Sequence, residues 1–260
     1  MIINTWIGFV LSFLISYIAH RRKSLSLSGF LSATMVGTLF YMFGSYVVWS
    51  ILIFFFLSSS VISKLSTEEA KLGGRNYIQV LSNAVVSLAF LTLFYILKDI
   101  TFLLVAVVAI AATTADTWAS EIGRISKGKT YSILTFKPME KGLSGAISLV
   151  GILASLIGAF VIGIIFITLY FIEHTFSFKL AIEWLSIITI SGFIGSILDS
   201  YLGVLLQAKY KDLKSGKIAE IITNTEQFIL ISGKKMITNN AVNFIMVLTI
   251  SLATYIFLVM

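Results

Sequence analysis

The sequence contains a stretch rich in glycine and lysine that could hold phosphate. Residues 123–130 read GRISKGKT and fit the pattern G-x-x-x-x-G-K-[ST] of nucleotide-binding loops. A P-loop lies between a buried strand and a helix, but this stretch follows TADTWASEI, the end of an apolar helix. We therefore expect no P-loop fold. Gly123, Gly128, Lys129 and the later Lys137 remain candidates for phosphate binding, because glycine lets backbone N–H groups approach an anion and lysine supplies charge.

Three carboxylates are candidates for a Mg²⁺ site. Asp116 and Glu121 follow the fifth apolar run, and Asp199 lies inside a later one, where an ionisable group is costly and usually functional. On one helix Asp116 and Glu121 would be about 140° apart, so they share a metal only if the helix ends between them or another segment contributes. The alternatives are solvated carboxylates at Asp116 and Glu121 and a purely structural hydrogen bond at Asp199.

A stripe of polar residues enters the fourth apolar run. Arg75, Gln79 and Asn83 have the spacing i, i+4, i+8, which puts them on one face of a helix. An arginine binds phosphate through two parallel hydrogen bonds. We expect this face to point into the bundle, although Arg75 could instead be a simple anchor at the membrane surface.

Other polar residues could complete such a site. Asn240 and Asn243 lie at the start of the last apolar run, and their amides could bind Mg²⁺ or phosphate. Ser144 and Gly145 open the sixth run, where N–H groups at a helix start could donate to phosphate. Helix capping and packing between helices would explain the asparagines equally well.

The chain has only two histidines, His20 and His174, and we expect them on opposite sides of the membrane. Neither is a good general base for a site on one face. An alcohol acceptor profits from a base, but a phosphate monoester, whose second pKa is about 6, is already largely ionised. The missing base therefore favours a monophosphate acceptor, although an aspartate could serve an alcohol.

These residues lie in a strongly apolar chain. Of its 260 residues, 58% are hydrophobic and 12% are charged, where soluble domains have about a quarter charged. Backbone polar groups cannot stay unpaired in lipid, so we predict an all-α, polytopic membrane helix bundle that forms one domain over residues 1–260. Its partner is the bilayer rather than a nucleic acid. The absence of cysteine excludes disulfides and thiolate chemistry.

The apolar runs predict eight spans, the first of them a retained helix rather than a signal peptide. They lie near residues 2–19, 26–43, 45–62, 77–97, 100–115, 143–172, 184–207 and 240–259.

The positive charges are distributed unevenly. Connections 20–25, 63–76, 116–142 and 208–239 carry 3, 3, 5 and 6 of the 19 Lys and Arg residues. The positive-inside rule therefore places these four connections in the cytoplasm and both termini outside. Topology explains most of the net charge of +7, and attraction of anionic lipid or phosphate is the other interpretation.

Several segments resemble one family of membrane proteins. They are ATTADTWASEIGRISKGK, KGLSGAISLVGILASLIG, KLGGRNYIQVLSNA, GFIGSILDSYLGVLLQ and NNAVNF. The resemblance as a whole covers most of the chain, from about residue 24 to residue 244. They look like the signature of the family that includes the plant phytyl-phosphate kinase of tocopherol synthesis and the human transmembrane protein nineteen. The pattern D-x-x-A-x-x-x-G with a later G-K is similar, more loosely, to the CTP-dependent dolichol and phytol kinases.

This resemblance implies a Mg²⁺-dependent kinase of the cell membrane, active at the cytoplasmic face. It would transfer a phosphoryl group from a nucleoside triphosphate, CTP by resemblance, to a polyprenyl monophosphate of the phytyl or geranylgeranyl type. The metal ligands would be Asp116, Glu121 and Asp199. The catalytic residues would be Asp116, Asp199, Arg75 and Lys129, and the binding residues Lys71, Gln79, Asn83, Gly123, Gly128, Lys137, Ser144, Gly145, Asn240 and Asn243. The alternatives are a transporter or flippase of a phosphorylated lipid or anion, and a membrane protein without chemistry.

Overall fold

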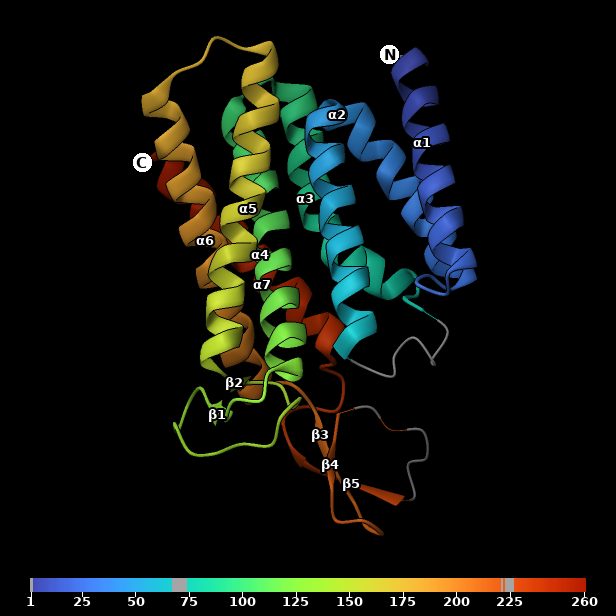
Figure 1. Ribbon diagram of the computed structural model, residues 1–260, viewed down its shortest axis with the longest axis vertical. Helices are drawn as coiled ribbons and strands as arrows, with labels where there is room; N and C mark the ends of the chain where they lie inside the picture. The colour runs from blue at the N-terminus through green and yellow to red at the C-terminus, as the bar shows by residue number, and fades with distance from the viewer. Residues whose placement is uncertain (1, 67–73, 221, 223–226) are drawn as a thin grey trace.

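The computed structural model describes residues 2–66, 74–220, 222 and 227–260. Within these residues there are seven helices, and all are long and apolar enough to cross a membrane. They are α1 (Ile2–Arg21), α2 (Leu27–Ser66), α3 (Tyr77–Leu97), α4 (Ile100–Ile125), α5 (Leu149–Glu173), α6 (Phe178–Leu205) and α7 (Asn239–Val259). The helices run side by side as one bundle (Figure 1). The prediction of a polytopic helical membrane protein is confirmed.

Helix α2 supplies two of the predicted spans, because it turns back at Ser45. Ser45 has φ 58° and ψ −171°, which no α-helix accommodates. In a straight helix Gly37 and Trp49 would be about 18 Å apart, yet a Cβ on Gly37 would lie 3.7 Å from Trp49 Nε1. The limbs 27–44 and 46–66 are therefore antiparallel (Figure 1), and the predicted eight crossings are present in seven helices.

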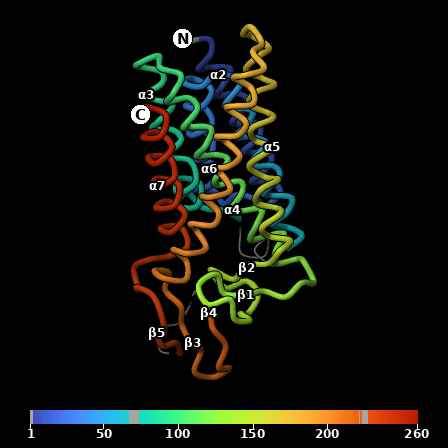
Figure 2. The backbone as a smooth tube through the Cα atoms, turned by 90° about the vertical axis from the view of Figure 1, so that its left-hand side faces the viewer, coloured from blue at the N-terminus to red at the C-terminus, as the bar shows by residue number. Residues whose placement is uncertain are grey.

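Helix α4 is the centre of the bundle. It packs against α2, α3, α5, α6 and α7, and it lies between them in both views (Figures 1 and 2). Its residues 102–115 are all buried. A helix that is apolar on every side must be surrounded by other helices, and Asp116, which directly follows this segment, is accordingly partly buried.

Small residues bring α4 and α6 together. A Cβ on Gly195 of α6 would lie 2.8 Å from Cβ of Ala112 in α4, so these two backbones approach closely. Both helices begin at the end of the bundle that carries the short connections 97–100 and 173–178, so they are parallel (Figure 1). Asp116 and Asp199 each lie four residues, about one turn, beyond this contact. The close packing therefore directs both carboxyl groups to the same place.

Two of the long connections contain short strands, which the all-α prediction did not include. The strands β1 (Tyr131–Ser132) and β2 (Ala146–Ile147) pair antiparallel. The strands β3 (Lys209–Asp212), β4 (Ile218–Ala219) and β5 (Phe228–Ser232) form an antiparallel sheet in the order β4-β3-β5. Both groups lie beyond the same end of the helices (Figure 2).

Three predicted spans have different ends in the structure: span 100–115 continues as a helix to Ile125, span 143–172 begins at Leu149, and span 184–207 begins at Phe178. Hydropathy marks apolar residues, whereas capping groups and tertiary contacts decide where a helix begins. At the start of α5 the N–H of Gly151 donates to Ser148 Oγ at 3.0 Å, which makes Ser148 the N-cap.

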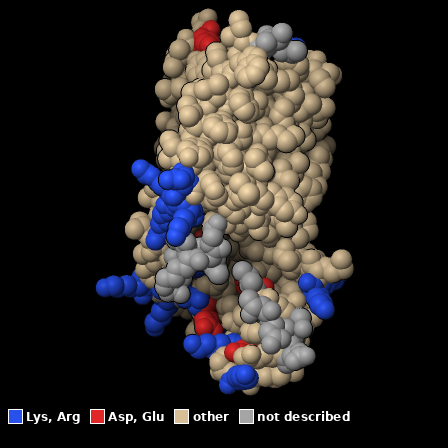
Figure 3. Space-filling model, turned by 90° about the vertical axis from the view of Figure 1, so that its right-hand side faces the viewer, with Lys and Arg blue, Asp and Glu red and all other residues tan. Residues whose placement is uncertain are grey.

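Charge divides the molecule into two ends. Lys and Arg side chains gather over the end that carries the strands, and an uncharged band covers the helices above it (Figure 3). Both termini lie at the opposite end (Figures 1 and 2). We call the strand-bearing end the basic end. The predicted orientation would place the basic end in the cytoplasm.

Candidate functional site

A cavity of about 860 Å³ lies at the basic end, between the helices and the strands. Its walls come from α2 to α7 and from the two strand-bearing connections. Most of the residues that the sequence suggested line it: Arg75, Gln79, Asn83, Asp116, Glu121, Gly123, Ser144, Gly145, Asp199, Asn240 and Asn243. The structure therefore brings together residues from distant parts of the chain.

Asp116 and Asp199 are in contact at the inner end of this cavity. Their carboxyl groups share a hydrogen bond between α4 and α6, and both are partly buried. Asp199 lies six residues before the end of α6 at Leu205, near the basic end rather than in the middle of its span. A hydrogen bond between two carboxyl groups requires one proton, and a divalent cation can replace that proton.

Amide side chains extend this pair toward α3. Asn243 of α7 lies between Asn83 and Asp199. In one orientation its Nδ2 donates to Asn83 Oδ1 at 3.3 Å, and in the flipped orientation its nitrogen donates to Asp199 Oδ1 at 3.1 Å. The flipped orientation also gives a 3.1 Å bond to the carbonyl oxygen of Asn239. Four helices thus contribute to one polar cluster.

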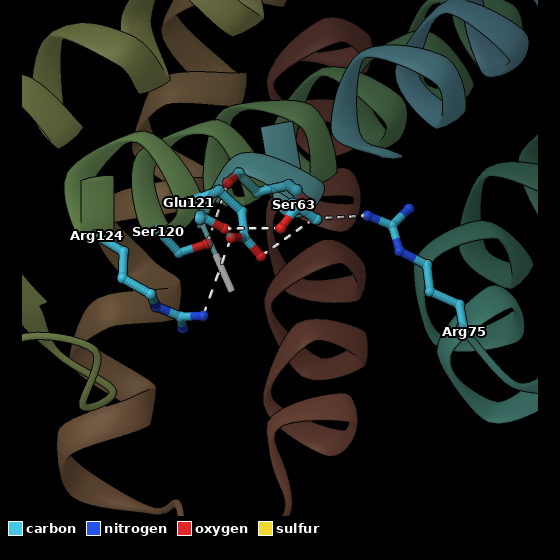
Figure 4. Close-up of polar contacts among 7 residues, drawn as sticks. Ser63, Arg75, Ser120, Glu121 and Arg124 are labelled. Atoms are coloured by element: carbon cyan, nitrogen blue, oxygen red, sulfur yellow. Dashed lines mark hydrogen bonds and ion pairs between the residues drawn. The ribbon is translucent and has the colours of Figure 1, made fainter. Parts of the chain in front are cut away.

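Glu121 lines the same cavity, but its carboxylate is bonded to α2, so its role as a third metal ligand stays a prediction that this geometry does not favour. Ser63 Oγ of α2 donates to Glu121 Oε1 at 3.2 Å, Ser66 Oγ donates to Oε2, and Arg124 Nη1 lies 3.9 Å from Oε2 (Figure 4). Because α4 continues past Glu121, the rotation of about 140° from Asp116 points this side chain toward α2. Among the described residues, no three Asp, Glu or His side chains could hold a metal.

Arg75 lies at the predicted mouth of α3 and is held by its backbone. Its N–H donates to Ser24 O at 3.0 Å, and its carbonyl oxygen accepts from Ser26 N–H at 3.0 Å. A side chain on Gly29 would overlap that carbonyl. The Arg75 guanidinium reaches Ser63 Oγ at 3.3 Å (Figure 4). These contacts position a cation at the cavity wall.

Gln79 has a second role besides lining the cavity. Its Oε1 accepts from Asn76 N–H at 2.9 Å, and the Asn76 side chain accepts from Gln79 N–H at 3.1 Å. The two residues form a reciprocal cap at the start of α3. Gln79 therefore fixes the beginning of the helix whose next polar turn carries Asn83.

Part of the lysine-rich motif lies outside the cavity. Gly128, Lys129 and Lys137 are exposed and do not line it, so their predicted roles in phosphate binding are not supported by their positions. Gly123 lies in α4, where a Cβ would be 3.2 Å from Ser148 Oγ, so it serves the packing of α4 against the start of α5. Residues 123–130 lie at the end of α4 and before β1, which is not the strand-to-helix position of a P-loop. Lys71 lies outside the described residues.

The cavity has other cations, which sequence reasoning missed. Arg124, Lys141 and Lys235 line it together with Arg75. The Nε of Arg124 is buried without a hydrogen-bond partner among the described residues. Lys141 Nζ donates to Ser126 O. The only signal for Arg124 in the sequence was its position one turn after Glu121 on what proved to be a continuing helix.

Ser144 does not open a helix, because α5 begins later, at Leu149. Its N–H donates to Glu220 Oε1 at 2.6 Å rather than standing ready at a helix start. Lys209 Nζ donates to Ser144 O at 2.8 Å. Burial lowers the pKa of the Lys209 ammonium, and the nearby Glu220 carboxylate opposes that shift. Glu220 had not been suggested by the sequence.

A second, smaller cavity of about 60 Å³ adjoins the first between α1, α2 and α3. Its walls are apolar apart from Ser12, Ser16, Arg75, Gln79 and Asn83, and the last three also line the large cavity. Arg75, just before α3, and Gln79 and Asn83 of α3 therefore lie between the large polar cavity and this second cavity, which we call the apolar cleft.

Comparison with known proteins identifies the family. Residues 10–251 match the integral membrane protein family DUF92. The chain is 30% identical over 274 residues to Protein PGR of Arabidopsis thaliana, covering 94% of this chain and 93% of that protein. It is 27% identical over 216 residues to an uncharacterized membrane protein of Methanocaldococcus jannaschii, covering 80% and 85% respectively. No solved structure matches it significantly. The chain therefore belongs to the DUF92 family of integral membrane proteins, which confirms the family resemblance of its sequence.

Proposed function

We propose that the protein is a membrane kinase that converts a polyprenyl monophosphate into the diphosphate at the expense of a nucleoside triphosphate. CTP is the proposed donor because of the resemblance to CTP-dependent lipid kinases. The observation that carries this proposal is the adjacent carboxyl groups of Asp116 and Asp199 inside a large cavity rimmed by cations. The cavity volume of about 860 Å³ is in the range of small-molecule sites.

Phosphoryl transfer depends chiefly on positioning and on charge stabilisation. Arg75 and Arg124 line opposite sides of the network around Glu121 (Figure 4), and each guanidinium can bind phosphate oxygens in parallel. Lys141 and Lys235 add point charges at the same cavity. Arg124, Lys141 and Lys235 would hold the donor phosphates and neutralise the charge that moves to the leaving diphosphate, and Arg75 would hold the acceptor phosphate.

The aspartate pair fits one Mg²⁺. This ion is usually held by one or two carboxylates together with substrate phosphates and water, so a third protein carboxylate is not required. Asp116 and Asp199 would supply the two carboxylates, and Asn243 would orient Asp199 through its amide. Bound there, Mg²⁺ would neutralise charge on the donor phosphates.

The acceptor would lie with its phosphate in the large cavity and only the first carbons of its tail in the apolar cleft, since a cleft of about 60 Å³ is too small for a whole polyprenyl chain. Arg75, Gln79 and Asn83 border both spaces, so a phosphate beside them would continue into an apolar chain between α1, α2 and α3. An oxygen of the acceptor phosphate attacks the terminal phosphorus of the donor, and the bond from that phosphorus to the leaving diphosphate breaks. The acceptor oxygen is already ionised near neutral pH, so no base is needed.

The test is direct assay of the purified protein in detergent with Mg²⁺, labelled CTP and phytyl or geranylgeranyl phosphate. We expect labelled diphosphate from the wild type and none from Asp116→Asn or Asp199→Asn. The matched control is Asp99→Asn, because Asp99 is the N-cap of α4 at the other end of the bundle and asparagine caps equally well. Retained turnover in both cavity variants would exclude the proposed metal site.

A further inference from the structure

The carboxylate of Glu220, just after β4, is held by hydrogen-bond donors of the large cavity. The N–H of Ser144 donates to Glu220 Oε1 at 2.6 Å, and Ser144 Oγ donates to Oε2 at 3.0 Å. Gln207 Nε2 donates to the same Oε2 at 2.8 Å. Donors from two separate segments converge on one anionic group, which is how proteins bind oxyanions.

The donors are held in place by contacts that do not involve Glu220. Gly145 has φ +82° and packs against α6, and a Cβ on Gly203 of α6 would lie 2.9 Å from Ser144 Cβ. Only glycine is free of strain at such a positive φ. Lys209, which is 6% exposed, holds the Ser144 carbonyl from the other side. The Ser144 donors would therefore keep their positions if Glu220 moved away.

Gln207 provides a second indication that a ligand binds here. It is 2% exposed and lines the cavity, and its Oε1 has no hydrogen-bond partner within the described parts of the chain. A buried acceptor without a partner is unfavourable. A ligand that accepts from Nε2 and donates to Oε1 would satisfy both atoms, and a phosphate group carrying one proton does both.

The donors lie close to the aspartate pair. Gly203, which touches Ser144, is four residues after Asp199 on α6, or about 6 Å along the helix axis. The negative charge of Glu220 lies close enough to Asp199 to repel the Asp199 carboxylate. Only neutral groups among the described residues hydrogen-bond to Glu220. The nearby Lys209 ammonium attracts this carboxylate, whereas the like charge of Asp199 repels it. A phosphate bound together with a cation would not suffer that repulsion.

We infer that Ser144 and Gln207 form an oxyanion subsite for a phosphate group of the substrates, and that Glu220 occupies it as a resident competitor until substrate binds. The inference rests on the proposed function for its ligand, because the phosphate could belong to the nucleotide or to the lipid. Binding of the ligand replaces the carboxylate on the same donors, and no covalent bond changes.

The experiment measures binding of inorganic pyrophosphate with Mg²⁺ to the full-length protein in detergent. Glu220→Gln keeps the size of the side chain and removes its charge, so we expect the Kd for pyrophosphate to fall about tenfold. Gln207→Met removes the amide donor and should raise the Kd for pyrophosphate severalfold. The control is Asp212→Asn, which changes a carboxylate that hydrogen-bonds to Ser215 and Lys214 of its own turn. It should leave the Kd unchanged.

Thermal unfolding identifies variants that do not fold. If Glu220→Gln is among them, Glu220→Asp withdraws the carboxylate by one methylene and should lower the Kd by a smaller factor. An unchanged or higher Kd in the folded Glu220 variants would overturn the inference, and so would the absence of pyrophosphate binding to any variant.

Competition then identifies the source of the phosphate. The subsite belongs to the donor if Glu220→Gln strengthens binding of CTP, and to the acceptor if it strengthens binding of phytyl phosphate. Tighter pyrophosphate binding without turnover of CTP would retain the subsite and refute the kinase. Turnover of CTP with a Kd for pyrophosphate that is insensitive to Glu220 substitution would support the kinase and refute the subsite.

Discussion

Replacing Gly195 with alanine should separate the two aspartates without altering either of them. The added Cβ would lie 2.8 Å from Ala112 Cβ and 3.3 Å from Met246 Sδ, whereas ordinary contacts begin at 3.4 Å. The α4 and α6 backbones must therefore move apart by at least 0.6 Å, the difference between 3.4 Å and 2.8 Å. Overpacking of this kind costs about 1–3 kcal/mol of folding free energy.

The larger effect should be on catalysis. A misplacement of about 1 Å in an active site can cost about a hundredfold in rate, and Asp116 and Asp199 lie one turn beyond the substituted position. We expect kcat for phosphoryl transfer to fall about tenfold to a hundredfold, with a smaller change in the melting temperature of the protein in detergent. The assay is turnover of CTP with phytyl phosphate, normalised to folded protein.

Gly8→Ala is the matched control for this variant. A Cβ on Gly8 would lie 2.7 Å from Tyr41 Cβ, so it creates a similar overlap between α1 and α2, far from the aspartates. It should lower stability and leave kcat unchanged. Full activity in Gly195→Ala, or an equal loss of activity in Gly8→Ala, would refute the argument that close packing of α4 and α6 sets the geometry of the pair.

Three further predictions test other parts of the structure. Arg124→Gln should raise the KM for CTP about tenfold because it removes a charge-assisted bond to phosphate. The control Lys129→Gln, on the exposed surface, should leave this KM unchanged. An equal rise of KM in both variants would contradict the assignment of the cavity cations. Ala33→Phe should fill the apolar cleft and raise the KM for phytyl phosphate but not for CTP, and an unchanged KM for the lipid would place its tail elsewhere. Hydrogen bonds from Ser215 and from the backbone N–H of Lys214 lower the pKa of Asp212 from 3.8 to about 2, so this carboxylate stabilises the β3–β4 turn above about pH 4 and loses that effect as the pH falls through 2. Pepsin should therefore cleave Asp212→Asn faster than the wild type at pH ~4.5 and equally fast at pH ~1, where the carboxylate is protonated. A difference that persists at the lower pH would refute this linkage.

Hydropathy alone predicted the bundle, because the cost of unpaired backbone groups in lipid leaves few other folds. It also placed the division between the second and third spans within one residue of Ser45. It could not predict where helices end. In the continuation of α4 to Ile125, Glu121 contacts both Arg124 and Ser63 of α2, and the contact with α2 is visible only in three dimensions.

For the site, the sequence identified the side chains that are costly inside a membrane and missed those held by the connections. Asp199 was suspected because a charge within lipid needs a reason, and its contact with Asp116 bears out the convergence of the two carboxylates. Lys129 was suggested by a motif whose loop faces outward. Glu220 carries no local signal, since its contact with Ser144 joins connections 76 residues apart in the chain.

The apolar outer half of α4 insulates the cavity electrically. Residues 102–112 read FLLVAVVAIAA, and all of them are buried, so this part of α4 offers an ion no polar side chain. Carrying a charge through such a segment is costly. An anion bound at the proposed site would therefore be separated from the opposite face of the membrane by this apolar part of α4.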